Sequence, residues 1–386
     1  MQYTKSSLAG TSYIPALDGF RGIAILLVVI SHYGVGHLLP GGFGVTLFFF
    51  ISGFLITRLL IAEYTERQTI DLRGFYFRRL LRLYPALLVM VVLAVGFTWA
   101  MGCGFQVGEI VSTLFYYRNY YMLYGHADAV ANCTRIFDIT WSLAIEEHFY
   151  LFFPLLFLAL YRRPNILAAA MAAIIVGVLI WRLRIMATDG LSELTVHRIY
   201  HLTDTRLDAI MFGCFVSLAV HQKWANRYLT CVGHPVVFAA AIGLLLFTFI
   251  YRDGAFRETW RYSFQGLALS VILPAILYES RYGTLTFWLS KPRLVLIGKL
   301  SYSLYLFHWI GLCVAENLIG GERLTLSWLL TAVPLGLTLS LLSYHYVEKP
   351  TARLRKRFGS TVETTVVGPK SAQVQVGKQA STPAVN

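Results

Sequence analysis

The stretch DGFRGIAILLVVISHYGVG, residues 18–36, places an arginine and a histidine in a run that is otherwise apolar. Arg21 and His32 lie eleven residues apart, so on an α-helix, at three turns plus about 20°, they share one face about 16 Å apart along its axis. Each residue also has a purely structural interpretation. Arg21 could extend its charge to the membrane interface, and His32 could be hydrogen-bonded to another helix. Neutral imidazole can also serve as a general base or pass a proton. The pair is therefore a candidate catalytic site.

The segment FYFRRLLRLYP, residues 75–85, carries three arginines with helical spacing. Arg78 and Arg82 are four residues apart and Arg79 and Arg82 are three apart, so a helix presents them as one cationic cluster. Planar guanidinium groups suit phosphate recognition. The alternative is a loop charge that fixes topology or contacts anionic lipid. From these residues alone, the two interpretations have equal weight.

The segment TWSLAIEEHFY, residues 140–150, places Glu146 and Glu147 in the first turns of an apolar helix. Two carboxylates are more than a membrane anchor needs, and one of them could orient and charge-balance a histidine. Glu147 could instead face solvent or another helix. Trp141 fits the interfacial aromatic belt, which is the default for a lone tryptophan at that depth. Glu146 is the candidate with a catalytic role.

Three further motifs, TDTRLDAIMFG (203–213), KLSYSLYLFHW (299–309) and YHYVEKP (344–350), lay polar groups near the ends of apolar runs or inside them. Each is a weak signal by itself, and His308 could be a histidine with only a structural role, hydrogen-bonded within the helix bundle. No metal site is expected. The supporting residues of the site are expected to be Asp18, Ser52, Trp141, Ser142, Arg206, Asp208, Tyr302 and His308.

Membrane helices are expected to position these residues. The chain has 386 residues, a mean hydropathy of +0.60, 56% hydrophobic residues and 14% charged residues, whereas soluble domains have about 45–50% apolar and about 25% charged residues. The expected fold is an all-α polytopic bundle of about ten transmembrane helices, since several apolar runs reach the roughly 20 residues that a span needs. The runs at 207–220 and 236–251 are short, so they are expected to be tilted, extended or partly buried in protein. The others lie near residues 20–38, 43–61, 83–101, 142–160, 165–183, 261–279, 294–315 and 326–346.

The basic residues indicate the orientation of the bundle, because loops rich in lysine and arginine stay cytoplasmic. With both termini inside, 20 basic residues fall in inside segments and seven in outside loops. Arg182 and Arg184, at an outer helix end, count against this assignment without reversing it. The net charge of +13 thus mostly reflects the membrane topology. The basic residues are distributed over several loops rather than gathered on one face, so nucleic-acid binding is not expected. The first run lacks a small-residue cleavage site, so an uncleaved first span is expected.

The domain organisation follows from the same runs. Residues 1–13 are expected to be a cytoplasmic N-terminal segment, 14–353 a membrane domain, and 354–386 a basic and then disordered cytoplasmic tail, with no fused soluble domain. Five cysteines do not make a disulfide framework. Cys103 and Cys133 share one expected outside loop, residues 102–140, where they could pair or remain free.

Together the motifs resemble those of the acyltransferase-3 family of integral membrane O-acyltransferases. The resemblance covers residues 14–353. It rests on seven motifs in the family's order: LDGFRGIAILLVVISHY, LFFFISGFLIT, FYFRRLLRLYP, WSLAIEEHFYL, TDTRLDAIMFG, GKLSYSLYLFHW and YHYVEKP.

The resemblance implies a membrane enzyme of about ten helices that moves acyl groups, usually acetyl from acetyl-CoA, onto hydroxyl groups. Acceptors in the family include lipopolysaccharide O-antigen, exopolysaccharide, Nod factors and macrolides. Arg21 and His32 match its essential Arg-x10-His pair, Arg79 and Arg82 its Arg-x-x-Arg motif for the CoA donor, and Glu146 its glutamate. His148 stands where glutamine is commoner.

Some members carry an additional esterase-like domain of the SGNH type after the membrane part. This chain is expected to lack it, so transfer to the acceptor would rest with the membrane domain or with a separate periplasmic partner. The resemblance implies no bound cofactor, with acyl-CoA as a substrate.

The resulting hypothesis is acetyl transfer across the inner membrane of the cell to an envelope glycan. Arg79 and Arg82, with Arg78, would hold the CoA phosphates, and the thioester would reach up the bundle toward His32. That histidine would act as general base or carry the acetyl group as nucleophile, and both roles remain open. The rival hypothesis is a transporter or flippase for a glycan or small solute, in which intramembrane charges line a substrate path. Inverted repeats or short broken helices would support the rival, and the sequence shows no clear case of either.

Overall fold

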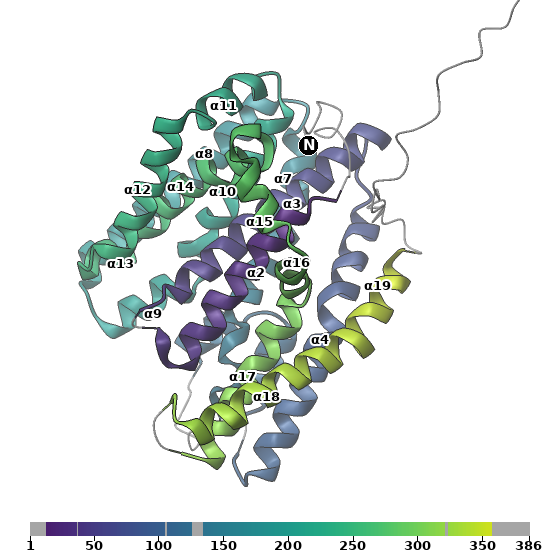
Figure 1. The fold of residues 1–386 in the computed structure, drawn as a ribbon, viewed down its shortest axis with the longest axis vertical. Coiled ribbons are helices and arrows are strands. Elements are labelled where there is room, and N and C mark those ends of the chain that lie inside the picture. Colours follow the sequence, from purple (N-terminus) through teal and green to yellow (C-terminus); the bar gives the residue numbers. More distant parts are fainter. Residues whose placement is uncertain (1–12, 37, 105, 126–133, 321–322, 357–386) are drawn as a thin grey trace, which may run out of the picture.

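The computed structural model describes residues 13–36, 38–104, 106–125, 134–320 and 323–356, and within them every regular element is helical. The expected all-α polytopic bundle is confirmed (Figure 1). The first half of the chain forms α2 (Pro15–Ile30), the π-helical segment η1 (Ser31–Val35), α3 (Gly41–Arg67), α4 (Leu72–Ala100), α5 (Val107–Leu114), α6 (Arg118–Tyr124), the 3-10 segment η2 (Thr134–Thr140), α7 (Trp141–Leu160) and α8 (Pro164–Asp189).

The second half contains more short helices than the first. They are α9 (Glu193–His201), α10 (Thr203–His221), α11 (Ala225–Val232), α12 (Pro235–Ile250), α13 (Gly254–Glu258), α14 (Trp260–Tyr278), η3 (Ser280–Tyr282), α15 (Gly283–Leu289), α16 (Pro292–Lys299), α17 (Ser301–Leu318), α18 (Leu326–Ser343), the π-helical segment η4 (Tyr344–Glu348) and α19 (Lys349–Lys356).

By length and composition, six helices in the described part of the chain can cross a membrane alone, and three bent helix pairs raise this to nine. The bent pairs are α11 with α12, α14 with η3 and α15, and α16 with α17. Broken helices, of which the sequence shows no clear case, are therefore present, because each pair bends by more than 40° at a short break. The tenth expected span, residues 207–220, is helix α10. It falls outside these candidates because Asp204, Arg206 and Asp208 all lie in its first turns. Arg206 and Asp208 are fully buried in protein, so α10 is an inner helix of the bundle.

Helices α2, α3 and α10 form the middle of the molecule (Figure 1). On one side α8 and α14 pack against α10, and α12 packs against α14. On the other side α17 packs against α2, and both α18 and α4 pack against α17. Close contact between α3 and α10 depends on glycine, because a Cβ added at Gly53 would lie 2.0 Å from the carbonyl oxygen of Ile210. One added at Gly213 would lie 1.9 Å from that of Phe50. The two backbones therefore touch, as small residues allow in membrane proteins.

Two of the expected supporting residues hold α10 in place. Asp208 accepts bonds of 2.9 and 2.6 Å from the two terminal nitrogens of Arg182, and both side chains are fully buried. Arg206 donates to the hydroxyl of Thr46 over 3.1 Å and lies 4.0 Å above the centre of the Tyr262 ring. Arg182 is therefore a buried partner of Asp208 rather than a loop charge, which removes one of the two exceptions to the predicted orientation.

Short elements cover the end of the bundle where α7 begins. They are α5, α6 and η2, drawn from the expected outside loop, with α9 beside them. Arg118 links them, since it donates to Glu109 over 3.0 Å and to Asp138 over 2.7 Å. Cys103 is disulfide-bonded, and Cys133, its predicted partner, lies outside the described residues.

Candidate active site

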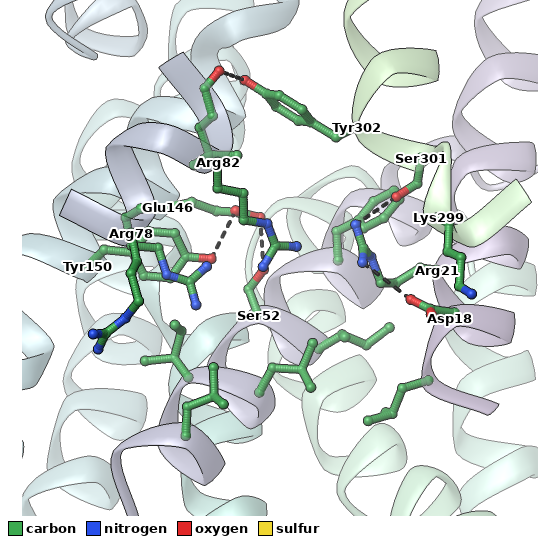
Figure 2. A pocket seen from close by; sticks show the side chains of 18 of the residues that line it. Asp18, Arg21, Ser52, Arg78, Arg82, Glu146, Tyr150, Lys299, Ser301 and Tyr302 are labelled. Carbon is green, nitrogen blue, oxygen red and sulfur yellow. Dashed lines mark hydrogen bonds and ion pairs between the residues drawn. The ribbon is translucent and has the colours of Figure 1, made fainter. Parts of the chain in front are cut away.

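A cavity of about 560 Å³ opens between α2, α3, α4, α7, α17 and α19. This volume is in the range of small-molecule sites, roughly 300–1,000 Å³. Figure 2 shows Arg21, Arg82 and Glu146 directed toward one space from three different helices. The cavity is lined by nine of the predicted site residues: Asp18, Arg21, Ser52, Arg78, Arg79, Arg82, Ser142, Glu146 and Tyr302. It is not lined by His32, Trp141, Arg206, Asp208 or His308.

The cavity is strongly cationic. Eight basic and four acidic side chains are among its lining residues. Because the walls also contain many apolar side chains, these charges act in a medium that screens them less than water does. The cavity therefore suits an anionic ligand that also has an apolar part.

Arg21 is held in the cavity wall by two partners. It donates to Asp18 over 3.3 Å and to the hydroxyl of Ser301 over 2.9 Å (Figure 2). Tyr13 donates to the other oxygen of Asp18 over 2.7 Å, and burial together with this bond raises the pKa of the tyrosine hydroxyl. A Cβ at Gly298 would lie 1.8 Å from the carbonyl oxygen of Asp18, so α16 and α2 touch beside this group. The Arg21 guanidinium is thus fixed before any ligand binds.

The three arginines of α4 have different surroundings. Arg78 pairs with Glu63 over 3.1 Å. The guanidinium of Arg79 lies 4.8 Å from the centre of the Tyr150 ring. Arg82 makes no hydrogen bond or ion pair with another described residue. Among the described residues Arg79 likewise has no hydrogen-bond or ion-pair partner, so Arg79 and Arg82 both keep their guanidinium donors available to a ligand.

Glu146 lies in the cavity and not beside the histidine. Its two carboxylate oxygens accept bonds from Ser52 over 3.1 Å and from Tyr150 over 3.2 Å (Figure 2). The expected contact in which Glu146 orients the His32 ring is not formed. Both carboxylate oxygens of Glu146 have partners in the cavity, and Nδ1 of His32 is bonded to His308. Glu146 instead places a carboxylate among the arginines of the cavity.

His32 and His308 form a directed pair. Nδ1 of His308 lies 2.8 Å from the carbonyl oxygen of Leu304, which can only accept, so that nitrogen carries a proton. In a neutral ring, Nε2 of His308 is then an acceptor. It lies 2.9 Å from Nδ1 of His32, which must donate. The remaining nitrogen of His32, Nε2, therefore has a free lone pair, as a general base or nucleophile requires.

The backbone around His32 departs from a regular helix. Residues Ser31–Val35 form a π-helical turn, which often occurs at functional sites, and Gly34 has φ of +115°, a value that favours glycine. Arg323 donates to the carbonyl oxygen of His32 over 2.9 Å, and the Trp309 ring meets the imidazole edge-on at 5.0 Å. These contacts fix the ring where α2 ends.

Helix α17 connects the cavity with the histidine pair. Ser301, Tyr305 and His308 have the spacing of one helix face, and the first two line the cavity. Tyr305 shares a short hydrogen bond of 2.5 Å with Ser142, and its ring lies 6.1 Å from that of His308. Arg21 and His32 thus do not line one cavity as expected. Arg21 lies inside it, and His32 lies beyond its inner end, past Tyr305 and His308.

Trp141 stands behind the cavity wall. It is only 6% exposed, so it is not a residue of the interfacial belt. Its ring packs at 6.3 Å from Phe49, which lines the cavity, and at 5.0 Å from Tyr200. Tyr200 in turn lines a second cavity of about 610 Å³ beside α9 and α13. Trp141 therefore lies between the two cavities.

Several residues that line the cavity were not predicted, among them Tyr150, Ser301, Tyr305 and Glu348. Ser301 and Tyr305 belong to the motif KLSYSLYLFHW and precede His308 by seven and three residues, so helical spacing could have revealed them. Glu348 belongs to YHYVEKP, where nothing local indicates that its carboxylate accepts a bond from Ser303.

The sequence matches a known protein family over most of its length. Residues 14–345 match the family described as the acyltransferase domain. Relatives include the O-acetyltransferase OatA of Staphylococcus aureus strains NCTC 8325 / PS 47 and MW2, each 30% identical over 352 residues and 88% of this chain. The chain spans 57% of the length of these relatives, and no solved structure matches it. Since the family match extends over most of its length, the chain belongs to the acyltransferase-3 family of membrane proteins.

Proposed function

We propose that the protein is a membrane O-acyltransferase that moves an acyl group, acetyl in the simplest case, from cytoplasmic acyl-CoA to a hydroxyl of a cell-envelope glycan. The observation that carries the proposal is the cationic cavity joined through Tyr305 to a histidine with a free lone pair. The names of the relatives, O-acetyltransferase, support acetyl as the group.

In this proposal the donor enters the cavity with its phosphates on the arginines. Arg82 offers unpaired guanidinium donors, while Arg79 and Arg78 add charge from the same helix. Arg21, which is bonded to Asp18 and Ser301, lines the same cavity from α2, the helix that continues toward His32. The apolar walls accommodate the pantetheine arm, whose thioester extends toward Tyr305 and His308.

The chemistry follows from the tautomer of His32. As general base, its Nε2 takes the proton of the acceptor hydroxyl while that oxygen attacks the thioester carbon. The carbon–sulfur bond breaks, and the CoA sulfur recovers the proton from the imidazolium. As acyl carrier, the same nitrogen attacks the thioester carbon and CoA leaves as the thiolate. The hydroxyl then attacks the acyl carbon, the carbon–nitrogen bond breaks, and the hydroxyl proton goes to the CoA sulfur. In either route, the bond from Nδ1 of His32 to His308 holds the ring and stabilises its protonated form.

The orientation is part of the proposal. The beginning of α2 and the C-terminal helix α19 line the same cavity, as expected if both ends of the chain lie on one side of the membrane. The excess of lysine and arginine in the corresponding loops supports the cytoplasmic side of the inner membrane.

The proposal is tested with radiolabelled acetyl-CoA in membranes that contain the protein, followed by measurement of label in envelope polysaccharide. We expect transfer by the native chain and a loss of about 100-fold or more in the Arg79→Ala/Arg82→Ala variant, because each removes charged hydrogen bonds to phosphate. The matched control is Arg67→Ala/Arg73→Ala, which removes two exposed arginines near the same mouth. No labelled glycan with the native chain, together with uptake of an unmodified solute, would support the transporter instead. Loss of O-acetyl esters in a deletion strain identifies the acceptor.

A further inference from the structure

The C-terminal helix contributes one whole face to the cavity. Tyr344, Glu348, Thr351, Ala352 and Arg355 all line it, and their spacing of four, seven, eight and eleven residues is that of a single helix stripe. The π-helical segment η4 carries the chain from α18 into α19 without a break, and α19 packs against α4. Arg355 falls in the region that was expected to be a tail.

Arg355 has the features of a ligand-binding arginine. Its side chain is half-buried, and it makes no hydrogen bond or ion pair with another described residue. Its main electrostatic neighbours are Arg82 and Arg79, followed by the carboxylate of Glu348 and then by Arg78. That carboxylate already accepts a bond from Ser303.

Four guanidinium groups from two helices thus converge on one region of the cavity, Arg78, Arg79 and Arg82 from α4 and Arg355 from α19. Like charges at close range in a partly desolvated space repel one another. Glu63 neutralises Arg78, and Glu348 offsets only part of the remaining charge. A bound polyanion removes this repulsion, and guanidinium groups from two directions can bind it on opposite sides.

We propose that Arg355, together with Arg82, binds a phosphate group of the acyl donor, so that the C-terminal helix forms one wall of the donor site. The inference rests on the proposed function, because it assumes a nucleotide thioester as the donor. CoA carries a 5′-diphosphate and a separate 3′-phosphate, which gives two helices distinct phosphates to bind. The shared chemistry, a phosphate in a cationic cavity, could also come from an anionic lipid headgroup, and the test separates these sources.

The test measures binding of radiolabelled acetyl-CoA to the purified full-length protein in nanodiscs of phosphatidylcholine alone. We expect Arg355→Gln to weaken binding by about tenfold or more, because a hydrogen bond between charged groups is lost. The loss should shrink as salt rises. Arg355→Lys, which keeps the charge, should retain most of the affinity. The matched control Arg353→Gln alters an exposed arginine on the same helix that does not line the cavity, and should bind like the native chain.

The outcomes separate this inference from the proposed function. Equal affinity of the Arg355→Gln and Arg353→Gln variants, with the native chain binding acetyl-CoA, overturns the role of Arg355 alone. No binding by the native chain overturns both. If Arg355→Gln loses co-purifying anionic phospholipid while its acetyl-CoA affinity is unchanged, the site belongs to a lipid headgroup and the inference is wrong.

Discussion

One backbone carbonyl, that of Leu304, determines the tautomers of both His308 and His32. Because the Leu304 oxygen only accepts, the proton positions of both rings follow from it, and the lone pair emerges on Nε2 of His32. A carboxylate partner, as expected for Glu146, would stabilise the imidazolium more strongly than a neutral imidazole does. The neutral partner still orients the ring and selects its tautomer.

Variants of the pair test this arrangement. His32→Ala should reduce acetyl transfer by about 100- to 10,000-fold while acetyl-CoA still binds, since the base or carrier is lost. His308→Ala should lower kcat by about 10- to 100-fold through loss of ring orientation. His308→Gln should recover part of this, because its amide oxygen can accept the bond from Nδ1. Transfer rates and acetyl-CoA affinity, measured side by side, distinguish these effects.

The control is His345→Ala. His345 is exposed, and its Nδ1 has the same kind of contact, 2.9 Å from the carbonyl oxygen of Leu341, but it is far along the chain from the pair. The His345→Ala protein should transfer acetyl at the native rate. A His308→Ala protein with native kcat, or a His308→Gln protein no better than His308→Ala, contradicts the positioning role.

At the scale of elements, backbone contact between helices explains two of the motifs. Gly53 lies in LFFFISGFLIT and Gly213 in TDTRLDAIMFG, and each faces the backbone of the other's helix. The same two motifs contain Ser52, which bonds to Glu146, and Asp208, which bonds to Arg182. The motifs thus combine a close helix contact with polar groups that depend on it.

We expect Gly213→Val to destabilise the protein by about 1–3 kcal/mol, because the added carbons overlap the backbone at Phe50 and force α3 and α10 apart. Acetyl transfer should fall in parallel, since Ser52 lies on α3. Gly243→Val on α12, where nothing lies within 4 Å of an added Cβ, should change stability by less than about 0.5 kcal/mol. Thermal unfolding in detergent measures both. Similar midpoints for the two variants would show that the contact matters little.

At the scale of the whole molecule, the cationic cavity and the histidine pair lie at different levels along the same helices. Helix α2 carries Arg21 in the cavity and continues into η1 with His32, and α17 carries Ser301 in the cavity and His308 two turns later. In the proposed function, a donor bound from one side therefore meets a base that lies toward the other, as transfer across a membrane requires.

The predicted orientation can be tested with a native cysteine. Cys231 on α11 is free and exposed, and the predicted orientation, which rests on basic residues such as Lys223 and Arg227, puts it on the cytoplasmic side. A membrane-impermeant maleimide should label it only after cells are permeabilised. In a Cys231→Ser background, Leu194→Cys on α9 should be labelled in intact cells, because Leu194 is 67% exposed at the opposite end. The reverse pattern would invert the topology.

Much of the fold and part of the site could be predicted from sequence. Long apolar runs predict helices, because in lipid the backbone N–H and C=O groups must be hydrogen-bonded within their own segment. The helical bundle was therefore expected. The run 207–220 was expected as a short span, tilted, extended or partly buried in protein, and α10 is indeed an inner helix whose Asp208 pairs with Arg182. The arginines at 78, 79 and 82 were expected together at one mouth because helical spacing places them on one side.

By itself the sequence determined the helical bundle, the cationic cluster of α4 and the membership of Arg21 and His32 in one helix, because these depend on local periodicity and composition. Only the tertiary structure decided that His308 is the partner of His32, that Glu146 bonds to Ser52 and Tyr150, and that Arg355 joins the arginines of α4. The partners are separated by up to 276 residues, and no local rule relates their positions. Side-chain contacts between helices are set by how the helices pack, which depends on the whole chain.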